Sequence, residues 1–247
     1  MSEGLDLAEL AMINDLARMQ VVSQNLANVA TTGYRADIAA TRLFQPELLR
    51  AQGELLLAPG DTLTPRIEAF TSHLDGTVRY TGNPLDVALN GDAFFAIETP
   101  DGEAYSRDGA FQLSPAGQLI NATGYPVLST SGLLRVGTPT PRIDQQGNVF
   151  DGEDFLGQLK LVRFRNPELL TRAGSGYVLP ARGQYALAAE VEEENLARQA
   201  YLENSNVQMS SEVVRMMEIL QHFRSSQNVI RGYDEMLNSA IRTIAEF

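Results

Sequence analysis

Apolar residues recur with a helical period near the start of the chain. The stripe between positions 5 and 29 is formed by Leu5, Met12, Leu16, Met19, Val22 and Leu26, with Ala8 and Val29 beside it. Asp15 is its one break. A sustained seven-residue recurrence is typical of an amphipathic helix that packs on another helix. We therefore predict a helix over residues 5–29 that stops at Thr31-Thr32-Gly33.

The same period is clearer near the other end of the chain. Alternating steps of four and three residues from Met209 meet apolar residues at nine of eleven positions, namely Met209, Val213, Met216, Leu220, Phe223, Ile230, Leu237, Ile241 and Ile244. The other two positions are Gln227 and Asp234. This pattern predicts a helix over residues 211–246. We expect the two terminal helices to pair as a coiled-coil-like stalk.

Between the helices the sequence is typical of short β-strands and tight turns. Asp-Gly or Asn-Gly pairs begin at positions 75, 90, 101, 108 and 151, and such pairs tolerate the positive φ angles of hairpin turns. The segment 113–120 also resembles 143–150 around a central glycine, which predicts two similar hairpins. The whole pattern indicates a central antiparallel β domain inserted between the helices, and hence a mixed α and β fold.

These changes in residue pattern divide the chain into five expected parts. Residues 1–35 hold the N-terminal helix, 36–74 form a connector, 75–170 the central β domain, 171–208 a second connector, and 209–247 the C-terminal helix. An isolated helix with an apolar stripe needs a partner that buries it. The two stripes could pack only on each other within one monomer, or also on copies and relatives in a filament. We favour the filament, which makes both stripes candidate assembly interfaces.

Composition narrows the range of partners. The formal charge of −12 and the pI near 4.6 disfavour binding to nucleic acid. The N-terminus carries acidic residues where a secretory signal would carry positive charges, and no uncharged stretch is suited to span a membrane. We therefore expect neither a cleavable signal peptide nor membrane insertion.

Enzyme motifs are missing from the sequence. It contains no cysteine, phosphate-binding loop, dinucleotide fingerprint or nucleophile elbow. The two histidines, His73 and His222, lack metal-binding spacing and have no partner nearby in sequence. Asp101 and Asp108 are each followed by glycine, which favours turns over a catalytic carboxylate pair. We expect no catalytic residues and no metal site.

Three stretches resemble the family of bacterial flagellar basal-body rod and hook proteins. They are the N-terminal Ser23-Gln-Asn-Leu-Ala-Asn-Val-Ala-Thr-Thr-Gly-Tyr-Arg35, the middle segment 81–95 with Tyr105-Ser-Arg-Asp-Gly-Ala-Phe111, and the tail Tyr201-Leu-Glu-Asn-Ser-Asn-Val207. The signature residues at the two ends are Asn25, Leu26, Ala27, Asn28, Gly33, Tyr34, Asn204, Ser205, Asn206 and Val207. Within the family, the length and the modest connector after Arg35 are most similar to proximal rod members, with distal rod members as the alternative.

The resemblance implies a structural subunit of the flagellar drive shaft, which transmits motor torque and contributes to motility. Family members leave the cell interior through the flagellar type III export apparatus without a cleaved signal. They assemble in the periplasm with copies of themselves and other rod proteins. Their terminal helices form an inner tube and the β domain an outer layer, with no cofactor or small-molecule substrate. One alternative is a hook-type member of the family. The other is an enzyme or ligand-binding β domain with helical appendages, and this alternative would need a cluster of polar residues in a pocket.

Overall fold

The computed structural model of the chain describes residues 3–42, 66–165, 167, 170–173, 177–180, 188–190 and 196–245. Contacts between residues divide the chain into two compact units. The helical unit takes residues 1–27, 37–70 and 208–247, and the β unit takes residues 28–36 and 71–207. Each unit is therefore assembled from segments that lie far apart in the sequence.

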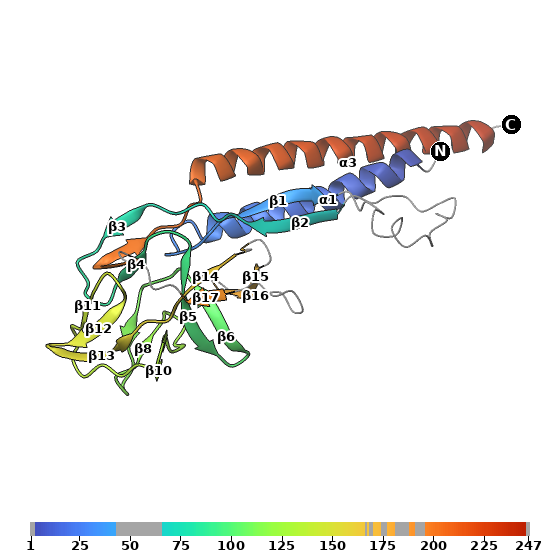
Figure 1. Cartoon of the computed structure of the whole chain (residues 1–247). Helices are drawn as coiled ribbons and strands as arrows, with labels where there is room; N and C mark the ends of the chain where they lie inside the picture. The colour runs from blue at the N-terminus through green and yellow to red at the C-terminus, as the bar shows by residue number, and fades with distance from the viewer. Residues whose placement is uncertain are drawn as a thin grey trace, which may run out of the picture. The chain divides into compact units, whose positions relative to one another are not determined.

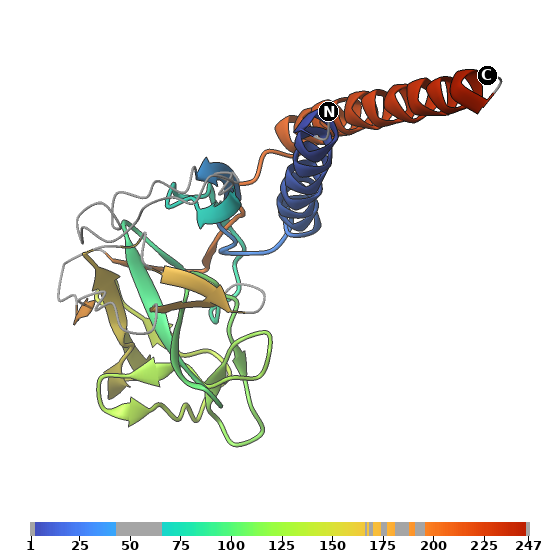
Figure 2. The same ribbon diagram turned by 90° about the vertical axis from the view of Figure 1, so that its right-hand side faces the viewer.

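The helical unit contains both predicted helices. Helix α1 spans Glu3–Ala27 and helix α3 spans Met209–Ala245. Strands β1 (Asp37–Arg42) and β2 (Arg66–Thr71) form a two-stranded sheet in the same unit (Figure 1). In both ribbon views the C-terminal part of α3 extends past the start of α1 (Figures 1 and 2). The prediction of one long helix near each end is confirmed.

A helix that crosses a membrane must be both long and apolar. Within the described part of the chain, no helix combines the length and the apolar character that crossing a membrane would require.

The predicted coiled-coil-like stalk is wrong. In a coiled coil the stripe residues of both helices interdigitate and are shielded from water. On the predicted stripes, however, Leu16 is 53% exposed and Ile241 is 64% exposed. Polar side chains occupy buried positions of the two helices instead, namely Asp15, Asn25, Glu212 and Ser226. The seven-residue recurrence finds apolar residues along each helix, but it carries no information on which surface covers them.

The β unit contains seventeen of the described strands. They are β3 (Val78–Tyr80), β4 (Val87–Leu89), β5 (Ala93–Thr99), β6 (Gly102–Ser106), β7 (Gln112–Leu113), β8 (Leu119–Ile120), β9 (Leu128–Ser129), β10 (Gly132–Leu133), β11 (Arg142–Ile143), β12 (Asn148–Asp151), β13 (Asp154–Gln158), β14 (Leu161–Phe164), β15 (Leu170–Ala173), β16 (Tyr177–Pro180), β17 (Ala188–Glu190), β18 (Ala197–Gln199) and β19 (Tyr201–Glu203). The largest sheet has six strands in the order β15-β16-β6-β5-β14-β17, and its registered pairs are antiparallel. The prediction of a central antiparallel β domain is confirmed.

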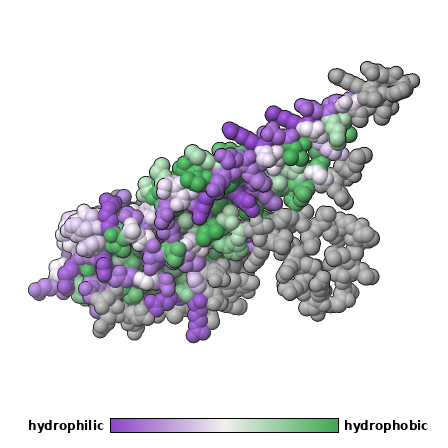
Figure 3. All heavy atoms as spheres, turned by 90° about the horizontal axis from the view of Figure 1, so that it is seen from above, coloured by the Kyte–Doolittle hydropathy of each residue, from purple (hydrophilic) through white to green (hydrophobic). Residues whose placement is uncertain are grey.

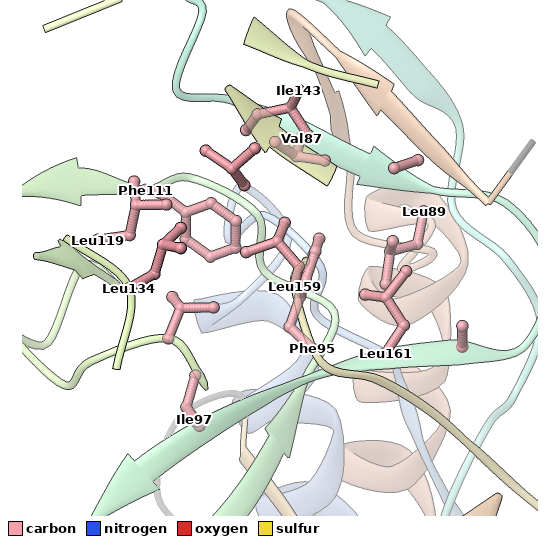
Figure 4. Packing of buried hydrophobic residues seen from close by; sticks show 14 of the residues in the cluster. Val87, Leu89, Phe95, Ile97, Phe111, Leu119, Leu134, Ile143, Leu159 and Leu161 are labelled. Carbon is pink, nitrogen blue, oxygen red and sulfur yellow. The ribbon is translucent and has the colours of Figure 1, made fainter. Parts of the chain in front are cut away.

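Strand β5 is buried on both faces, and it organises the interior of the β unit. Because successive side chains of a strand point to opposite faces, Phe95 and Ile97 enter one apolar cluster while Phe94 and Ala96 enter another. The first cluster is the larger, and Figure 4 shows Phe95 among the aliphatic side chains of β4, β8 and β14. The ring of Phe111 meets that of Phe95 edge to face, with 4.9 Å between centroids.

The two predicted glycine-turn hairpins are present. Strands β7 and β8 pair Leu113 with Leu119, and strands β11 and β12 pair Ile143 with Val149. The turns are closed in the same way: Ser114 Oγ accepts from the amide of Gln118 at 3.0 Å, and Asp144 Oδ1 accepts from the amide of Asn148 at 2.8 Å. The internal similarity seen in the sequence therefore corresponds to a repeated local structure.

Candidate functional site

Exposed apolar side chains are concentrated on the two helices of the helical unit. The exposed ones are Leu7, Ile13 and Leu16 on α1, and Met209, Val214, Met217, Leu220, Val229, Met236, Leu237 and Ile241 on α3. In the space-filling view, hydrophobic green residues alternate with hydrophilic purple ones along the helical unit (Figure 3). Large exposed apolar surface on a folded chain commonly marks a site of contact with another protein.

The predicted interface residues divide into two groups by burial. The buried or partly buried residues are Val22, Leu5, Met12, Met19 and Leu26 on α1, and Val213, Met216, Phe223 and Ile230 on α3. Exposed are Leu16, Met209, Leu220, Leu237 and Ile241. The side chain of Ile244 lies outside the described residues. The side chains of the second group are therefore the more accessible part of the predicted interface.

The polar residues between α1, β1 and α3 connect these three elements. Asn25 accepts from the amide of Asp37 at 2.9 Å and donates to its carbonyl oxygen at 2.8 Å, which ties the end of α1 to β1. Its Nδ2 also donates to Glu212 Oε2 at 3.3 Å. A groove of about 310 Å³ is lined by these residues together with Arg18, Val22, Ile38 and Arg215. Asn25, a predicted signature residue, therefore has a structural task inside the helical unit.

His222 has a partner that sequence reasoning missed. Its Nδ1 lies 2.5 Å from Oδ2 of Asp15, although Asp15 is 207 residues away in the chain. The Asp15 side chain is only 2% exposed. The break in the N-terminal stripe is thus a buried carboxylate with a specific partner on α3, and it lies too far from His222 in the sequence for spacing to reveal the pair.

Replacing His222 with alanine is expected to destabilise the helical unit by about 1–3 kcal/mol, because Asp15 stays buried and loses this hydrogen bond. Urea unfolding followed by far-ultraviolet circular dichroism measures the change. Gln221→Ala is the matched control, since Gln221 is the exposed neighbour in sequence. Equal unfolding midpoints for the two variants would contradict the proposed role of the Asp15–His222 contact.

Signature residues from the two ends of the sequence meet inside the β unit. The amide of Gly33 donates to the carbonyl oxygen of Glu203 at 2.8 Å. Asn206 accepts from the amide of Ala36 at 2.7 Å and donates to the carbonyl oxygen of Leu74 at 2.8 Å. Gly33 has a φ of +63°, and a Cβ placed on it would lie 2.4 Å from the carbonyl carbon of Arg107. The glycine is required both for its conformation and for this close approach.

Four charged side chains form a cluster beside these signature residues. Arg107 and Glu203 are paired at 2.8 Å, and Arg35 and Asp75 at 2.7 Å. Cross-contacts of 3.4 Å from Arg107 to Asp75 and 3.7 Å from Arg35 to Glu203 complete what we call the four-charge cluster. Both arginines and Glu203 are buried, whereas the Asp75 side chain is 54% exposed. Burial lowers the pKa of Arg107, and the charge of Glu203 opposes that shift.

The neighbouring Asp108 is a structural carboxylate. Its Oδ1 accepts from the hydroxyl of Thr32 at 2.5 Å and from the amide of Ala110 at 3.1 Å. Burial raises the pKa of Asp108 above its ordinary value, and the Thr32 hydrogen bond works against this. These bonds give the carboxylate a local structural role, but the tight turn predicted from its Asp-Gly context is not formed, because residues 107–109 have irregular backbone and Gly109 does not adopt a positive φ.

Comparison with known proteins reproduces the three stretches of the resemblance. Residues 5–35 match the family model "Flagella basal body rod protein", residues 88–151 match "Flagellar hook protein FlgE/F/G D1 domain", and residues 198–243 match "Flagellar basal body rod FlgEFG protein C-terminal". The rod protein FlgG of Agrobacterium fabrum is 30% identical over 94% of this chain and 96% of the relative. The chain belongs to the flagellar basal-body rod protein family.

Other relatives carry the names of two rod proteins. FlgG of Buchnera aphidicola subsp. Acyrthosiphon pisum is 30% identical over 95% of this chain and 94% of its own length. FlgF of Mesorhizobium japonicum is 27% identical over 99% of this chain and 98% of its own length. These names describe a structural part of the flagellar basal body rather than an enzyme.

The regions matched by the rod-family models contain three residues of the four-charge cluster, whereas Asp75 lies outside them. Arg35 ends the N-terminal match and Glu203 lies inside the C-terminal match, while Arg107 lies in the middle one. Further exposed apolar residues outside the predicted stripes were missed, among them Val214 and Met217. Their spacing of three residues on α3 was a usable signal for a second apolar face.

Proposed function

We propose that this rod-family chain polymerises through the exposed apolar faces of α1 and α3, with copies of itself and with other rod proteins as partners. The observation that carries the proposal is the concentration of large exposed apolar side chains on these two helices. The β unit, in contrast, buries most of its large apolar residues in its own clusters. A subunit of a helical polymer needs such surface, since head-to-tail contacts that do not close generate an open helical assembly.

The finer parts of the proposal follow from membership of the family. We place the subunit in the periplasmic rod of the basal body, reached through the flagellar export apparatus, where it passes torque along the drive shaft without catalysis. We prefer the proximal position because of the length of the chain and its modest connector after Arg35. The distal position is the alternative, since relatives of both names match with similar identity. The five-part division with a β domain at 75–170 is kept as a sequence-based scheme, although contacts group residues 171–207 of its second connector with the β unit.

The decisive experiment is Leu220→Asp. Leu220 is 37% exposed on α3 in the single chain, so the new carboxylate can reach water and the monomer loses about 1 kcal/mol, the typical cost of a point substitution. In an assembled rod the same position would be covered, and an unpaired buried charge is strongly unfavourable. We expect normal levels and only a small fall in the unfolding midpoint, together with loss of incorporation into basal bodies and loss of motility.

The matched control is Gln221→Asp, which introduces the same charge at the neighbouring exposed position. It is expected to be incorporated at close to the normal level. Incorporation of Leu220→Asp equal to that of the control would remove the support for α3 as an assembly surface.

A further inference from the structure

Residues 196–207 cross the β unit as one extended segment, which we call the closing segment. It contains β18 and β19, and its backbone is bonded at almost every second residue. The amide of Asn90 donates to Leu196, and the amide of Ala197 donates to Gln145 at 2.9 Å. Further along, the amide of Asn204 donates to the carbonyl oxygen of Thr77 at 2.8 Å. The segment therefore binds parts of the chain that precede it by fifty to more than a hundred positions.

Two strands depend on this segment for their pairing. Among the described residues, β4 pairs with β18 alone and β3 pairs with β19 alone. All three residues of β4 are buried, and Leu89 belongs to the same large apolar cluster as Leu196 and Ala197. Without the closing segment, a buried strand would lose its ladder partner, and buried backbone groups without partners are costly.

The same segment supplies the buried acid of the four-charge cluster. Glu203 faces Arg107 at 2.8 Å and also accepts from the amide of Gly76 at 3.0 Å. If Glu203 were absent, the two buried arginines would share a single carboxylate, that of the half-exposed Asp75. A buried charge left without its partner is strongly unfavourable.

The close fit of the segment adds a steric condition. A Cβ built on Gly76 would lie 1.8 Å from the carbonyl oxygen of Asn204, so the two backbones touch directly. Gln199, also in the closing segment, donates to the carbonyl oxygens of Pro84 at 2.8 Å and Pro141 at 2.6 Å. Hydrogen bonding, apolar burial and charge neutralisation thus converge on the same twelve residues.

We propose that the closing segment is a latch for the β unit: strands β3 to β14 do not form a stably closed core until residues 196–207 are seated. Folding of residues 78–164 then awaits a segment that lies in the last quarter of the sequence. This inference concerns the single chain and stands independently of the proposed role in the rod. During synthesis, which begins at the N-terminus, the latch delays closure of the β unit until most of the chain has been made.

Native-state amide hydrogen exchange on the full-length protein tests the latch. Amides of the closing segment and amides of the core strands β5 and β14 are expected to exchange with the same opening free energy, because they open together. If amides of the closing segment exchange with a much smaller opening free energy than amides of β5 and β14, the segment is peripheral to the core and the proposal fails.

A charge-removing variant provides the second measurement. Glu203→Gln keeps the shape of the side chain but removes the charge that neutralises Arg107, so exchange should accelerate about tenfold or more in both sets of amides. Glu98→Gln is the control, since Glu98 is an exposed carboxylate on β5, and it should leave both rates unchanged. Acceleration confined to the closing segment and its partners β3 and β4 would overturn the proposal. If Glu203→Gln does not fold, the comparison within the wild-type protein decides alone.

Discussion

Replacing Arg107 with methionine is expected to destabilise the β unit by about 3–5 kcal/mol, because it leaves Glu203 buried without its closest cation. Glu203 is 3% exposed and so gains little from water. Arg35 is 3.7 Å away and compensates only in part. Urea unfolding followed by tyrosine fluorescence measures the loss, since the chain has no tryptophan.

The double variant Arg107→Met with Glu203→Met separates charge from packing. It removes both members of the pair and leaves Arg35 and Asp75 paired at 2.7 Å. Replacing a complete buried ion pair with apolar side chains is often close to neutral. The double variant should therefore be more stable than Arg107→Met alone. A double variant that loses the sum of the two single effects would show that the charges are not coupled.

Gly33→Ala is expected to destabilise the β unit by about 2–4 kcal/mol. Alanine is strained in the left-handed backbone conformation of this position, and its side chain would displace the neighbouring segment. The added Cβ would meet backbone atoms of Arg107 and Asp108, each at 2.4 Å, and backbone cannot rotate away as a side chain can. The same unfolding measurement applies. The change should also loosen the amide hydrogen bond from Gly33 to Glu203.

Gly124→Ala is the control that isolates the conformational part of this cost. Gly124 also has a positive φ, of +88°, but no atom lies within 4 Å of the point that its Cβ would occupy. It should lose only about 1–2 kcal/mol. If the two alanine variants were equally destabilised, close packing against Arg107 would not be the reason for glycine at position 33.

The sequence was sufficient for the elements that have a local signature. Helical recurrence identified α1 and α3 to within about two residues, which is the usual uncertainty of helix ends. Glycine turns located the hairpins β7–β8 and β11–β12. In both cases the information lies within a few neighbouring residues, and periodicity or turn chemistry reports it directly.

The contacts between distant residues could not be obtained in this way. The stripe on α1 gave no indication that Asp15 would be buried against His222, because a carboxylate in an apolar stripe reads as an exposed break. The four-charge cluster draws its members from positions 35, 75, 107 and 203, and no spacing rule connects them. The coiled-coil-like stalk failed for the same reason, since a stripe such as that of Leu220 and Leu237 does not specify its partner.

The paired hairpins β7–β8 and β11–β12 show how little residue identity a recurring module needs. Across the eight aligned positions 113–120 and 143–150, only the glycine is the same in both copies. What recurs is a short oxygen acceptor at the second position, the glycine, and apolar residues at the ends, with Leu119 and Val149 both fully buried. Even the exit is equivalent, because the carbonyl oxygens of Gly117 and Gly147 each accept an amide from a later strand region. The two copies thus keep one geometry with almost entirely different residues, so the module is recognised by these roles rather than by residue identity.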